Sequence, residues 1–185
     1  MNYERIESDH PPGKNYWDES RAILITYGDS ITGPPEPPLA SLNEFVEQRL
    51  SDVISDVHIL PFFPSSSDDG FAVKDYLSVD GELGQWSDIE LICENRGLLV
   101  DLVINHCSSE HPWFEQFKSN ASPGKDFFVE VDPLSDLSKV VRPRTSELLR
   151  ETEREDGSSF VWCTFSHDQV DLDFANPEVL KEMVS

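Results

Sequence analysis

The stretch that decides the fold of this protein is Leu99-Val100-Asp101-Leu102-Val103-Ile104-Asn105-His106. It is a nearly continuous apolar run that ends in an Asn-His pair. A strand buried on both faces, as in a parallel sheet covered by helices, has this composition of Val, Ile and Leu. In a barrel of parallel strands, the functional groups gather where the strands end. We therefore predict a buried strand over Leu98–Ile104 that delivers polar side chains to a site at its C-terminal end.

Two further short apolar segments, Ala22–Tyr27 and Asp56–Leu60, have the composition of buried strands. Between them, a loop with four prolines and a glycine is followed by apolar residues that recur at helical spacing from Leu39 to Leu50. The order strand, helix, strand predicts a βαβ unit, and its right-handed crossover makes the two strands parallel.

A second unit of the same kind ends on the Leu98–Ile104 strand. The sequence Ser87-Asp88-Ile89-Glu90 has the Ser-x-x-Glu form of a helix capping box. Gly97 stands where a C-terminal helix cap belongs. These signals predict a helix over Asp88–Arg96.

The chain of 185 residues is too short for a complete eight-stranded β/α barrel, which takes about 250 residues. We predict an α/β fold that holds the first three βα units of a (β/α)8 TIM barrel. The expected organisation is a loosely ordered lead-in (1–20), the barrel strands and helices (21–106), an inserted segment (107–175) and the start of a further helix (176–185). We expect this chain to be the N-terminal part of a larger enzyme.

The inserted segment is too long for an ordinary βα connection. Within it, Arg150 to Gly157 reads as a charged loop and Phe160–Phe165 as strand-like. After it, Asn176 and Pro177 have the residue types of a helix N-cap and first helical position.

The charge balance argues against two classes of partner. Thirty-six acidic and fourteen basic residues give a formal net charge of −22. Nucleic acid and anionic membrane surfaces both need a basic face on the protein, so neither is expected as a partner. No apolar run approaches the ~18 residues of a membrane span, and the N-terminus lacks the apolar core of a signal peptide. A cytoplasmic protein is therefore expected.

Three cysteines, Cys93, Cys107 and Cys163, are widely spaced and form no Cys-x-x-Cys pair. An odd count without such a pair argues against a disulfide framework and against a structural zinc site. We predict three buried thiols.

Several segments together resemble the α-amylase superfamily of retaining glycoside enzymes. Asp101–His106 is similar to its first signature, Asp-x-x-x-Asn-His, and Gln169–Asp173 to the motif that closes its inserted B domain. Five shorter segments resemble the sucrose phosphorylase branch of that superfamily: Ile25–Asp29, Val57–Phe63, Asp68–Phe71, Val141–Arg144 and Val161–Phe165. Within this branch, residues 64–71 are most similar to the glucosylglycerate phosphorylase subgroup.

The resemblance implies the phosphorolysis of sucrose or a related α-glucoside to glucose 1-phosphate by a retaining double displacement. Such a mechanism needs two carboxylates about 5 Å apart. In the family, the aspartate nucleophile and the glutamate acid/base lie on strands after the B domain, so we expect both beyond Ser185. Asp171 and Asp173 match the B-domain motif and not the nucleophile. The expected partners are a small-molecule glucoside and inorganic phosphate, with no cofactor and no metal.

Six residues match substrate-binding positions of the family. Asp68 and His106 are expected to hold the glucose ring through hydrogen bonds to its hydroxyls. Phe71 offers an apolar platform against a sugar face. Arg144, in preference to Arg142, is expected near the acceptor site because a guanidinium forks onto phosphate oxygens. The last two, Phe165 and Gln169, are expected to border the acceptor subsite.

Other interpretations of the same residues remain open. The family also contains hydrolases of α-glucosidic bonds, and a non-catalytic carbohydrate-binding module is a third possibility. Without the resemblance, Asp68 reads as a turn aspartate, His106 as a core histidine and the two arginines as partners of surface acids. The acceptor, whether fructose, fructose phosphate or glycerate, is not specified by the sequence.

The net charge of −22 leads to a first prediction. Repulsion between like charges opposes the compact state and is screened by salt. The melting temperature of the chain should therefore rise between low and moderate sodium chloride concentration in a thermal melt. A melting temperature that stays flat or falls would contradict this expectation.

Overall fold

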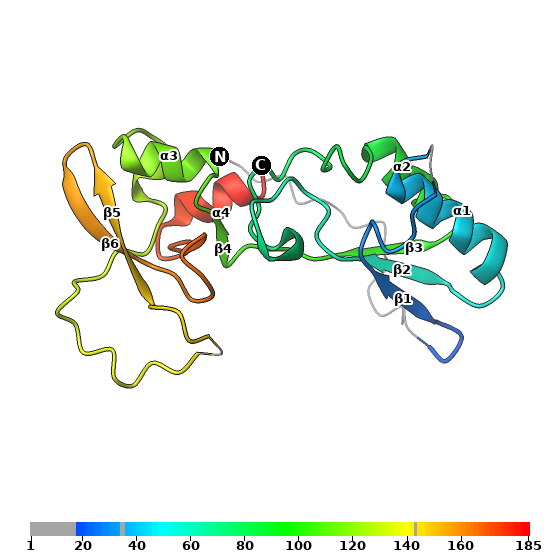
Figure 1. Ribbon diagram of the computed structural model, residues 1–185, viewed down its shortest axis with the longest axis horizontal. Helices are drawn as coiled ribbons and strands as arrows, with labels where there is room; N and C mark the ends of the chain where they lie inside the picture. The colour runs from blue at the N-terminus through cyan, green and yellow to red at the C-terminus, as the bar shows by residue number, and fades with distance from the viewer. Residues whose placement is uncertain (1–17, 34–35, 143) are drawn as a thin grey trace.

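A computed structural model describes residues 18–33, 36–142 and 144–185 of the chain. The protein is elongated, with a three-stranded sheet and two helices at one end and a β-hairpin with a short helix at the other (Figure 1). The fold is mixed α/β, as predicted. Most of the predicted lead-in, residues 1–17, lies outside the described residues.

The sheet consists of β1 (Ile23–Thr26), β2 (Asp56–Ile59) and β3 (Gly97–Val100), in that order. Both pairings are parallel, with Ile23 opposite Asp56 and Asp56 opposite Gly97. The predicted succession of two βαβ units is thus confirmed.

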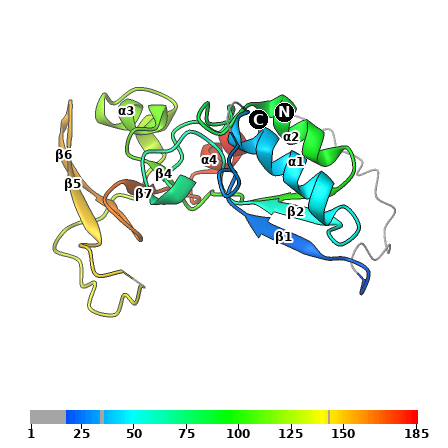
Figure 2. The same ribbon diagram turned by 45° about the vertical axis from the view of Figure 1, so that its right-hand side comes forward.

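Helices α1 (Pro38–Leu50) and α2 (Trp86–Cys93) connect the strands and cover one face of this sheet (Figure 2). Proline at the first position of α1 has no N–H to leave unpaired, which suits a helix start. The first core forms between these helices and the sheet; its buried apolar residues are Leu39, Leu42, Val46, Val57, Ile59, Phe62, Val79, Ile89 and Ile92.

The bounds of the second helix differ from the prediction. Helix α2 begins at Trp86, because the Asp88 carboxylate reaches back to accept a hydrogen bond from the Gln85 N–H at 2.9 Å. The predicted Ser87–Glu90 capping box is therefore wrong. Gly97 is the first residue of β3 and not a helix cap.

Gly97 is small for a packing reason. A Cβ atom built on it would lie 2.1 Å from Oδ1 of Asp56, a buried carboxylate on the neighbouring strand. The Asp56 carboxylate in turn accepts hydrogen bonds from Arg21 at 3.1 and 3.2 Å. Glycine leaves room for this partly buried ion pair.

The predicted strand over Leu98–Ile104 is shorter than expected and is not buried on both faces. Strand β3 ends at Val100, because its pairing with β2 stops at Ile59. Val100 is 47% exposed and Leu102 is 74% exposed. Residues 101–104 lead on from the sheet without regular structure.

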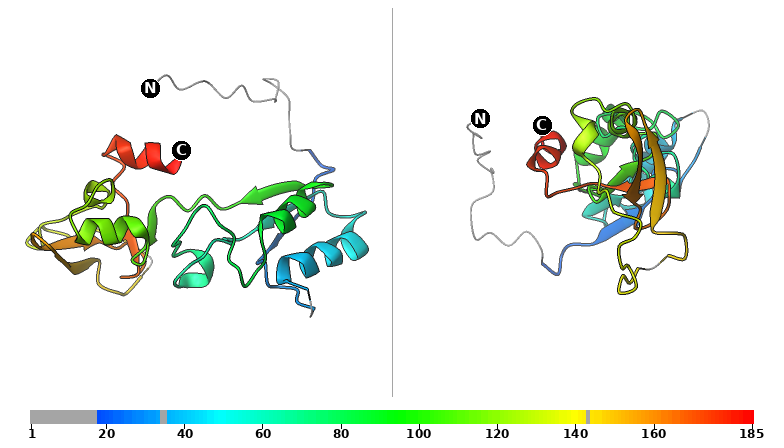
Figure 3. Two further views of the ribbon diagram at one scale, coloured as in Figure 1. Left: turned by 90° about the horizontal axis from the view of Figure 1, so that it is seen from above. Right: turned by 90° about the vertical axis from the view of Figure 1, so that its left-hand side faces the viewer.

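The remaining elements pack around a second core. They are β4 (His106–Ser108), α3 (Pro112–Lys118), β5 (Leu149–Arg154), β6 (Gly157–Trp162), β7 (Gln169–Asp171) and α4 (Pro177–Met183). Strands β4 and β7 are antiparallel, as are β5 and β6. The left view of Figure 3 shows α3, β5 and β6 at the end of the molecule opposite α1 and α2. The core itself contains Cys107, Phe114, Phe117, Phe127, Phe128, Val161, Cys163, Val170, Leu172 and Val179.

The segment from Arg150 to Gly157 is a β-hairpin and not the charged loop that we predicted. In its first strand, the exposed Glu151 and Glu153 stand on either side of Thr152, which is buried. The Arg154 guanidinium lies 4.2 Å from the centre of the Phe117 ring and 3.0 Å from the Glu130 carboxylate. Packing of the arginine stem and the ion pair thus stabilise a strand that composition alone does not indicate.

Two of the three cysteine predictions agree with the structure. Cys107 and Cys163 are buried, but Cys93 is exposed at the last position of α2. The predicted cap of α4 is also present, with the Asn176 side chain accepting a hydrogen bond from the Glu178 N–H. Within the described ranges, no helix is long and apolar enough to cross a membrane.

Helix α3 begins at a buried histidine whose protonation the fold opposes. The His111 Nδ1 atom accepts a hydrogen bond from the Trp113 N–H at 3.1 Å, so it must carry a lone pair. The ring packs against both Tyr76 and Trp113, and burial lowers the pKa of His111 to about 4.

We predict that His111 makes the free energy of unfolding decrease as the pH is lowered. The unfolded chain protonates His111 near its ordinary pKa of about 6.5, whereas the folded chain resists until about pH 4. The lost free energy of unfolding is about 3 kcal/mol when the pH falls from 7 to 4, at about 1.4 kcal/mol per unit. Denaturant unfolding should show a smaller loss for His111→Asn, which keeps a capping acceptor.

Replacement of the exposed His167 by Asn provides the control and should leave the pH dependence unchanged. Parallel pH profiles for His111→Asn and the wild type would show that His111 is not the group responsible.

Candidate functional site

A cavity of about 440 Å³ lies where the two halves of the molecule meet. Its walls come from segments that are far apart in the sequence: the end of β1, the loop after β2, the segment after β3, and the residues around β4 and β7. All six predicted binding residues line it. The lining residues are Tyr27, Asp68, Asp69, Phe71, Asp101, Leu102, Val103, Asn105, His106, Arg144, Phe165 and Gln169.

The loop that carries Asp68 has an unusual backbone. Asp68, Asp69 and Gly70 all have positive φ, at 57°, 51° and 99°. Aspartate tolerates this left-handed region better than most residues, but each such position still costs free energy. At Gly70 a Cβ atom would lie 2.4 Å from the Pro61 carbonyl oxygen, so this position requires glycine. The fold therefore forces a tight bend that presents Asp68 at the cavity.

Gln169 holds the Asp68 side chain from the opposite wall. Its Nε2 donates to Asp68 Oδ2 at 2.9 Å, and its Oε1 accepts from the Ser166 hydroxyl at 3.0 Å. Because one end must donate and the other must accept, these partners fix the orientation of the amide. Gln169 is only 2% exposed, so its position is rigidly set by packing as well.

His106 completes this cluster. Its Nε2 lies 3.0 Å from the Phe71 carbonyl oxygen and 3.2 Å from Gln169 Nε2. Burial lowers the pKa of His106, although the hydrogen bond to Phe71 and the nearby Asp171 and Asp68 oppose this effect. The ring is therefore neutral at pH 7. Because a carbonyl oxygen only accepts, Nε2 carries the proton that it donates to Phe71, and the nearby Gln169 amide group cannot donate to the same nitrogen.

The backbone around His106 is fixed from behind the cavity. The Tyr76 hydroxyl lies 2.9 Å from the Val103 carbonyl oxygen and 3.1 Å from that of His106. On the cavity side, the Phe165 ring lies 5.1 Å from the imidazole. Tyr76 thus holds the backbone of His106, and Phe165 packs against its ring.

The two arginines of the Arg-Pro-Arg sequence have different roles. Arg142 donates to the Thr164 carbonyl oxygen at 3.1 Å and to the Ser146 hydroxyl at 3.3 Å, which stabilises the loop. Arg144 lies 5.7 Å from the centre of the Phe165 ring. Across the described ranges, its guanidinium makes no hydrogen bond or ion pair, and the residue lines the cavity.

Six lining residues were not among the predicted ones. Tyr27 follows β1, and Asp101, Leu102, Val103 and Asn105 follow β3, at the C-terminal edge of the sheet; Asp69 follows Asp68 in the bend. The strand ends were the available signal, because side chains at this edge converge in parallel sheets. The Asp101 carboxylate lies 3.0 Å from His58 Nε2.

Asp171 and Asp173 do not line the cavity. Asp171 stands opposite His106 in the β4–β7 pair and accepts hydrogen bonds from Thr164 Oγ1 at 2.6 Å and from its N–H at 2.9 Å. Burial nevertheless raises the pKa of Asp171. The hydrogen bonds of Asp171 thus fix Thr164, the residue directly before Phe165.

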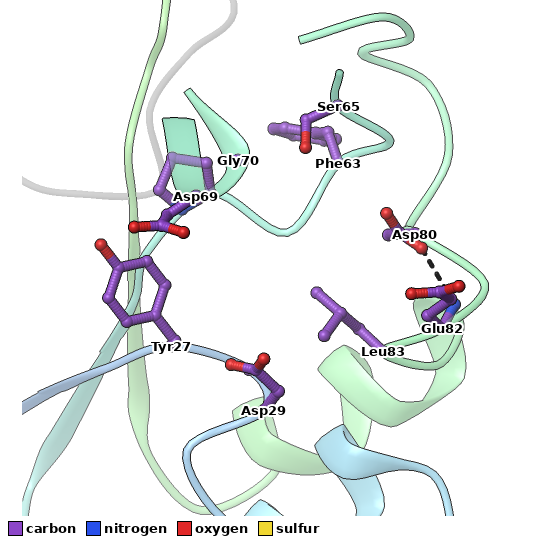
Figure 4. Close-up of a pocket in the computed structure, with 11 residues that line it drawn as sticks. Tyr27, Asp29, Phe63, Ser65, Asp69, Gly70, Asp80, Glu82 and Leu83 are labelled. Carbon is purple, nitrogen blue, oxygen red and sulfur yellow. Dashed lines mark hydrogen bonds between the residues drawn. The ribbon is translucent and has the colours of Figure 1, made fainter. Parts of the chain in front are cut away.

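A second hollow, of about 550 Å³, adjoins the cavity through Tyr27 and Asp69 (Figure 4). Asp29, Asp80 and Glu82 also line it, so its character is acidic. Asp80 is engaged locally, since its carboxylate accepts from the Glu82 N–H at 2.9 Å. Among the residues that the structure describes, no group of three or more His, Cys, Asp or Glu side chains is arranged to hold a metal ion.

The chemistry of the main cavity suits a polyhydroxylated ligand. It combines three carboxylates, two amides, an imidazole and a guanidinium with two phenylalanine rings. Such a set accepts and donates hydrogen bonds around a ring of hydroxyls and covers an apolar face.

Comparison with known proteins identifies relatives of this chain. The chain is 51% identical over 168 residues to a glucosylglycerate phosphorylase of Allomeiothermus silvanus, covering 91% of this chain and 30% of that protein. It is 49% identical over 178 residues to a glucosylglycerate phosphorylase of Spirochaeta thermophila, covering 96% of this chain and 30% of that protein. The chain thus spans about a third of the length of these relatives.

Among solved structures, a sucrose 6F-phosphate phosphorylase from Thermoanaerobacter thermosaccharolyticum superposes with a TM-score of 0.80 at 34% identity, over 91% of this chain and 36% of that one. The model of the α-amylase catalytic domain matches residues 53–185. On this evidence, the chain belongs to the α-amylase catalytic domain family.

Proposed function

We propose that this chain forms the glucosyl-binding part of a retaining glycoside phosphorylase. The reaction transfers a glucosyl unit from an α-glucoside to inorganic phosphate and yields glucose 1-phosphate. One observation carries the proposal: the six side chains expected to bind substrate come from distant parts of the sequence and line a single cavity. The names of the relatives support the same reaction class.

The sheet β1–β3 fits the first three βα units of a (β/α)8 barrel, with residues 107–175 as an insertion after the third strand. The parallel order β1-β2-β3 and the position of the cavity at the C-terminal ends of these strands support this assignment. The domain limits at residues 20, 106 and 175 remain predictions.

The roles of the side chains follow from their chemistry. The Asp68 carboxylate accepts hydrogen bonds from sugar hydroxyls, and a neutral His106 with Gln169 completes the polar wall. Phe71 and Phe165 cover the apolar face of the sugar. Because these groups are held before a ligand arrives, little rotational freedom is lost on binding.

Arg144 is the group proposed to attract phosphate. The chain carries a formal net charge of −22, so an anion needs a local positive group to enter. The Arg144 guanidinium lies over the Phe165 ring at the cavity, and a guanidinium binds two phosphate oxygens at once.

The bond-breaking groups are proposed to lie outside these residues. In the double displacement, a carboxylate attacks the anomeric carbon while a carboxylic acid protonates the leaving oxygen. Phosphate then displaces the carboxylate and gives its proton to the acid/base group. This chain binds and orients the sugar in both steps. Asp171 does not line the cavity, which supports leaving it out of the nucleophile role.

Glucosylglycerate is the favoured donor, because the relatives that are 51% and 49% identical are glucosylglycerate phosphorylases, whereas the sucrose 6F-phosphate phosphorylase is 34% identical.

A hydrolase and a non-catalytic carbohydrate-binding module are the alternatives. The full-length protein should release glucose 1-phosphate from glucosylglycerate only with phosphate. Cleavage at the same rate without phosphate would favour the hydrolase, and binding without cleavage the binding module. The cytoplasmic location and the absence of nucleic acid partners stay predictions.

Replacing Asp68 by Asn tests the sugar-binding role. Asparagine accepts positive φ as readily as aspartate, so the bend is retained while the charge is lost. A hydrogen bond to a charged group contributes about 1.5–3 kcal/mol, so kcat/KM for the glucoside should fall roughly 10- to 100-fold. Asp52→Asn, which removes a negative charge at an exposed position, should leave kcat/KM unchanged. Equal kinetics for Asp68→Asn and Asp52→Asn would exclude this role.

Replacing Arg144 by Lys tests phosphate recognition. Lysine keeps the charge but loses the bidentate geometry, so the KM for phosphate should rise about tenfold, with the KM for the glucoside changed much less. Steady-state kinetics with each substrate varied in turn separate the two effects. The exposed Arg49→Lys serves as the control. A rise confined to the glucoside KM would place Arg144 at the sugar and not at phosphate.

A further inference from the structure

Asp168, directly before Gln169, sits at the centre of a cluster of four serines. Ser66 and Ser67 donate their hydroxyl protons to its Oδ2 at 2.6 and 2.5 Å, and Ser109 donates to its Oδ1 at 2.8 Å. The Ser109 N–H also donates to the Asp168 carbonyl oxygen at 2.7 Å. Three hydroxyl groups therefore converge on a single half-buried carboxylate.

The direction of the protons can be worked out for the fourth serine. The Ser66 and Ser108 hydroxyl oxygens are 2.6 Å apart. Because Ser66 gives its only proton to Asp168, the proton between the two serines must come from Ser108. Ser108 is fully buried and also accepts a hydrogen bond from the Glu110 N–H at 2.9 Å. The cluster is thus fully satisfied only when Asp168 is ionised.

The electrostatics agree with this arrangement. Burial by itself disfavours the charged form of Asp168, but the hydrogen bonds from Ser66, Ser67 and Ser109 outweigh it and lower the pKa of the carboxyl group. The carboxylate therefore stays charged at neutral pH and accepts all three hydroxyl protons.

The cluster joins three of the segments that build the cavity. Ser66 and Ser67 immediately precede Asp68 in the strained loop, Ser108 and Ser109 follow His106, and Asp168 precedes Gln169. On the cavity side, the same three segments meet again through Asp68, His106 and Gln169. The loop with Asp68 has further contacts with the second half, among them the Ser108 N–H to the Val73 carbonyl oxygen at 2.9 Å and the Lys74–Glu110 ion pair at 3.6 Å.

We propose that Asp168 is a positioning residue, which anchors the loop through Ser66 and Ser67 and so sets the distance of Asp68 from Gln169 and His106 for binding the glucosyl unit. This role rests on the proposed function of the cavity. Asp168 does not itself line the cavity, so it acts through Asp68.

Two variants of the full-length protein test this role from opposite sides. Asp168→Asn removes the charge, and Ser66→Ala/Ser67→Ala removes the loop donors but leaves the carboxylate. In both, the KM for glucosylglycerate should rise about tenfold, with kcat and the KM for phosphate changed by less than about threefold, since a ground-state binding group is displaced. Ser109→Ala removes a hydroxyl donor to Asp168 that lies outside the loop, so the rise in KM for glucosylglycerate should be several-fold smaller.

A double-mutant cycle separates positioning from a general loss of stability. If Asp168 acts through Asp68, then Asp168→Asn should lower kcat/KM far less in the Asp68→Asn background than in the wild type. An equal loss in both backgrounds, or an equal effect of Ser109→Ala and Ser66→Ala/Ser67→Ala, would overturn the proposal.

Hydrogen exchange gives a readout that does not depend on catalysis. The amides of Ser66 and Phe71 are hydrogen-bonded within the loop, and they should exchange faster in Asp168→Asn. Unchanged exchange would overturn the anchoring. A wild-type protein that binds no glucoside would overturn the proposed function and this role with it. A wild-type protein that binds glucoside no better than Asp168→Asn would overturn only the role of Asp168.

Discussion

Hydrogen bonds between the 64–74 loop and the segments around β4 and β7 hold the two halves of the molecule in register. Each half has its own apolar core, and these cores share no buried residue. The polar contacts therefore decide how the halves sit at the cavity, because apolar packing is not directional but hydrogen bonds are. Tyr76, just after this loop, supports the same junction through its hydrogen bonds to the carbonyl groups of Val103 and His106. The geometry of the cavity is thus a property of the junction and not of either core.

Much of the sheet was predictable because its signals are local. Short apolar runs gave β1 and β2, helical spacing gave α1, and Asn176-Pro177 gave the start of α4. The six predicted cavity residues came from family motifs, and no periodicity would have selected Arg144 over Arg142. The structure adds a physical reason for that choice: Arg142 is engaged with the Thr164 carbonyl group.

The failed predictions depended on contacts between distant residues. Gly97 looked like a helix cap, yet it is small because the Asp56 carboxylate packs against it. Arg150–Gly157 looked like a loop because its stabilising partners, Phe117 and Glu130, lie on other elements. The serine cluster around Asp168 joins residues about a hundred positions apart, and a single sequence carries no signal for such pairing.

The walls of the cavity extend from Tyr27 to Gln169, and this span has a thermodynamic consequence. A partly folded chain cannot present the complete set of contacts, so a ligand that uses the whole cavity binds only the fully assembled molecule. Ligand capture and folding then form one linked equilibrium, in which a ligand at a hundred times its dissociation constant adds about 2.7 kcal/mol to the native state.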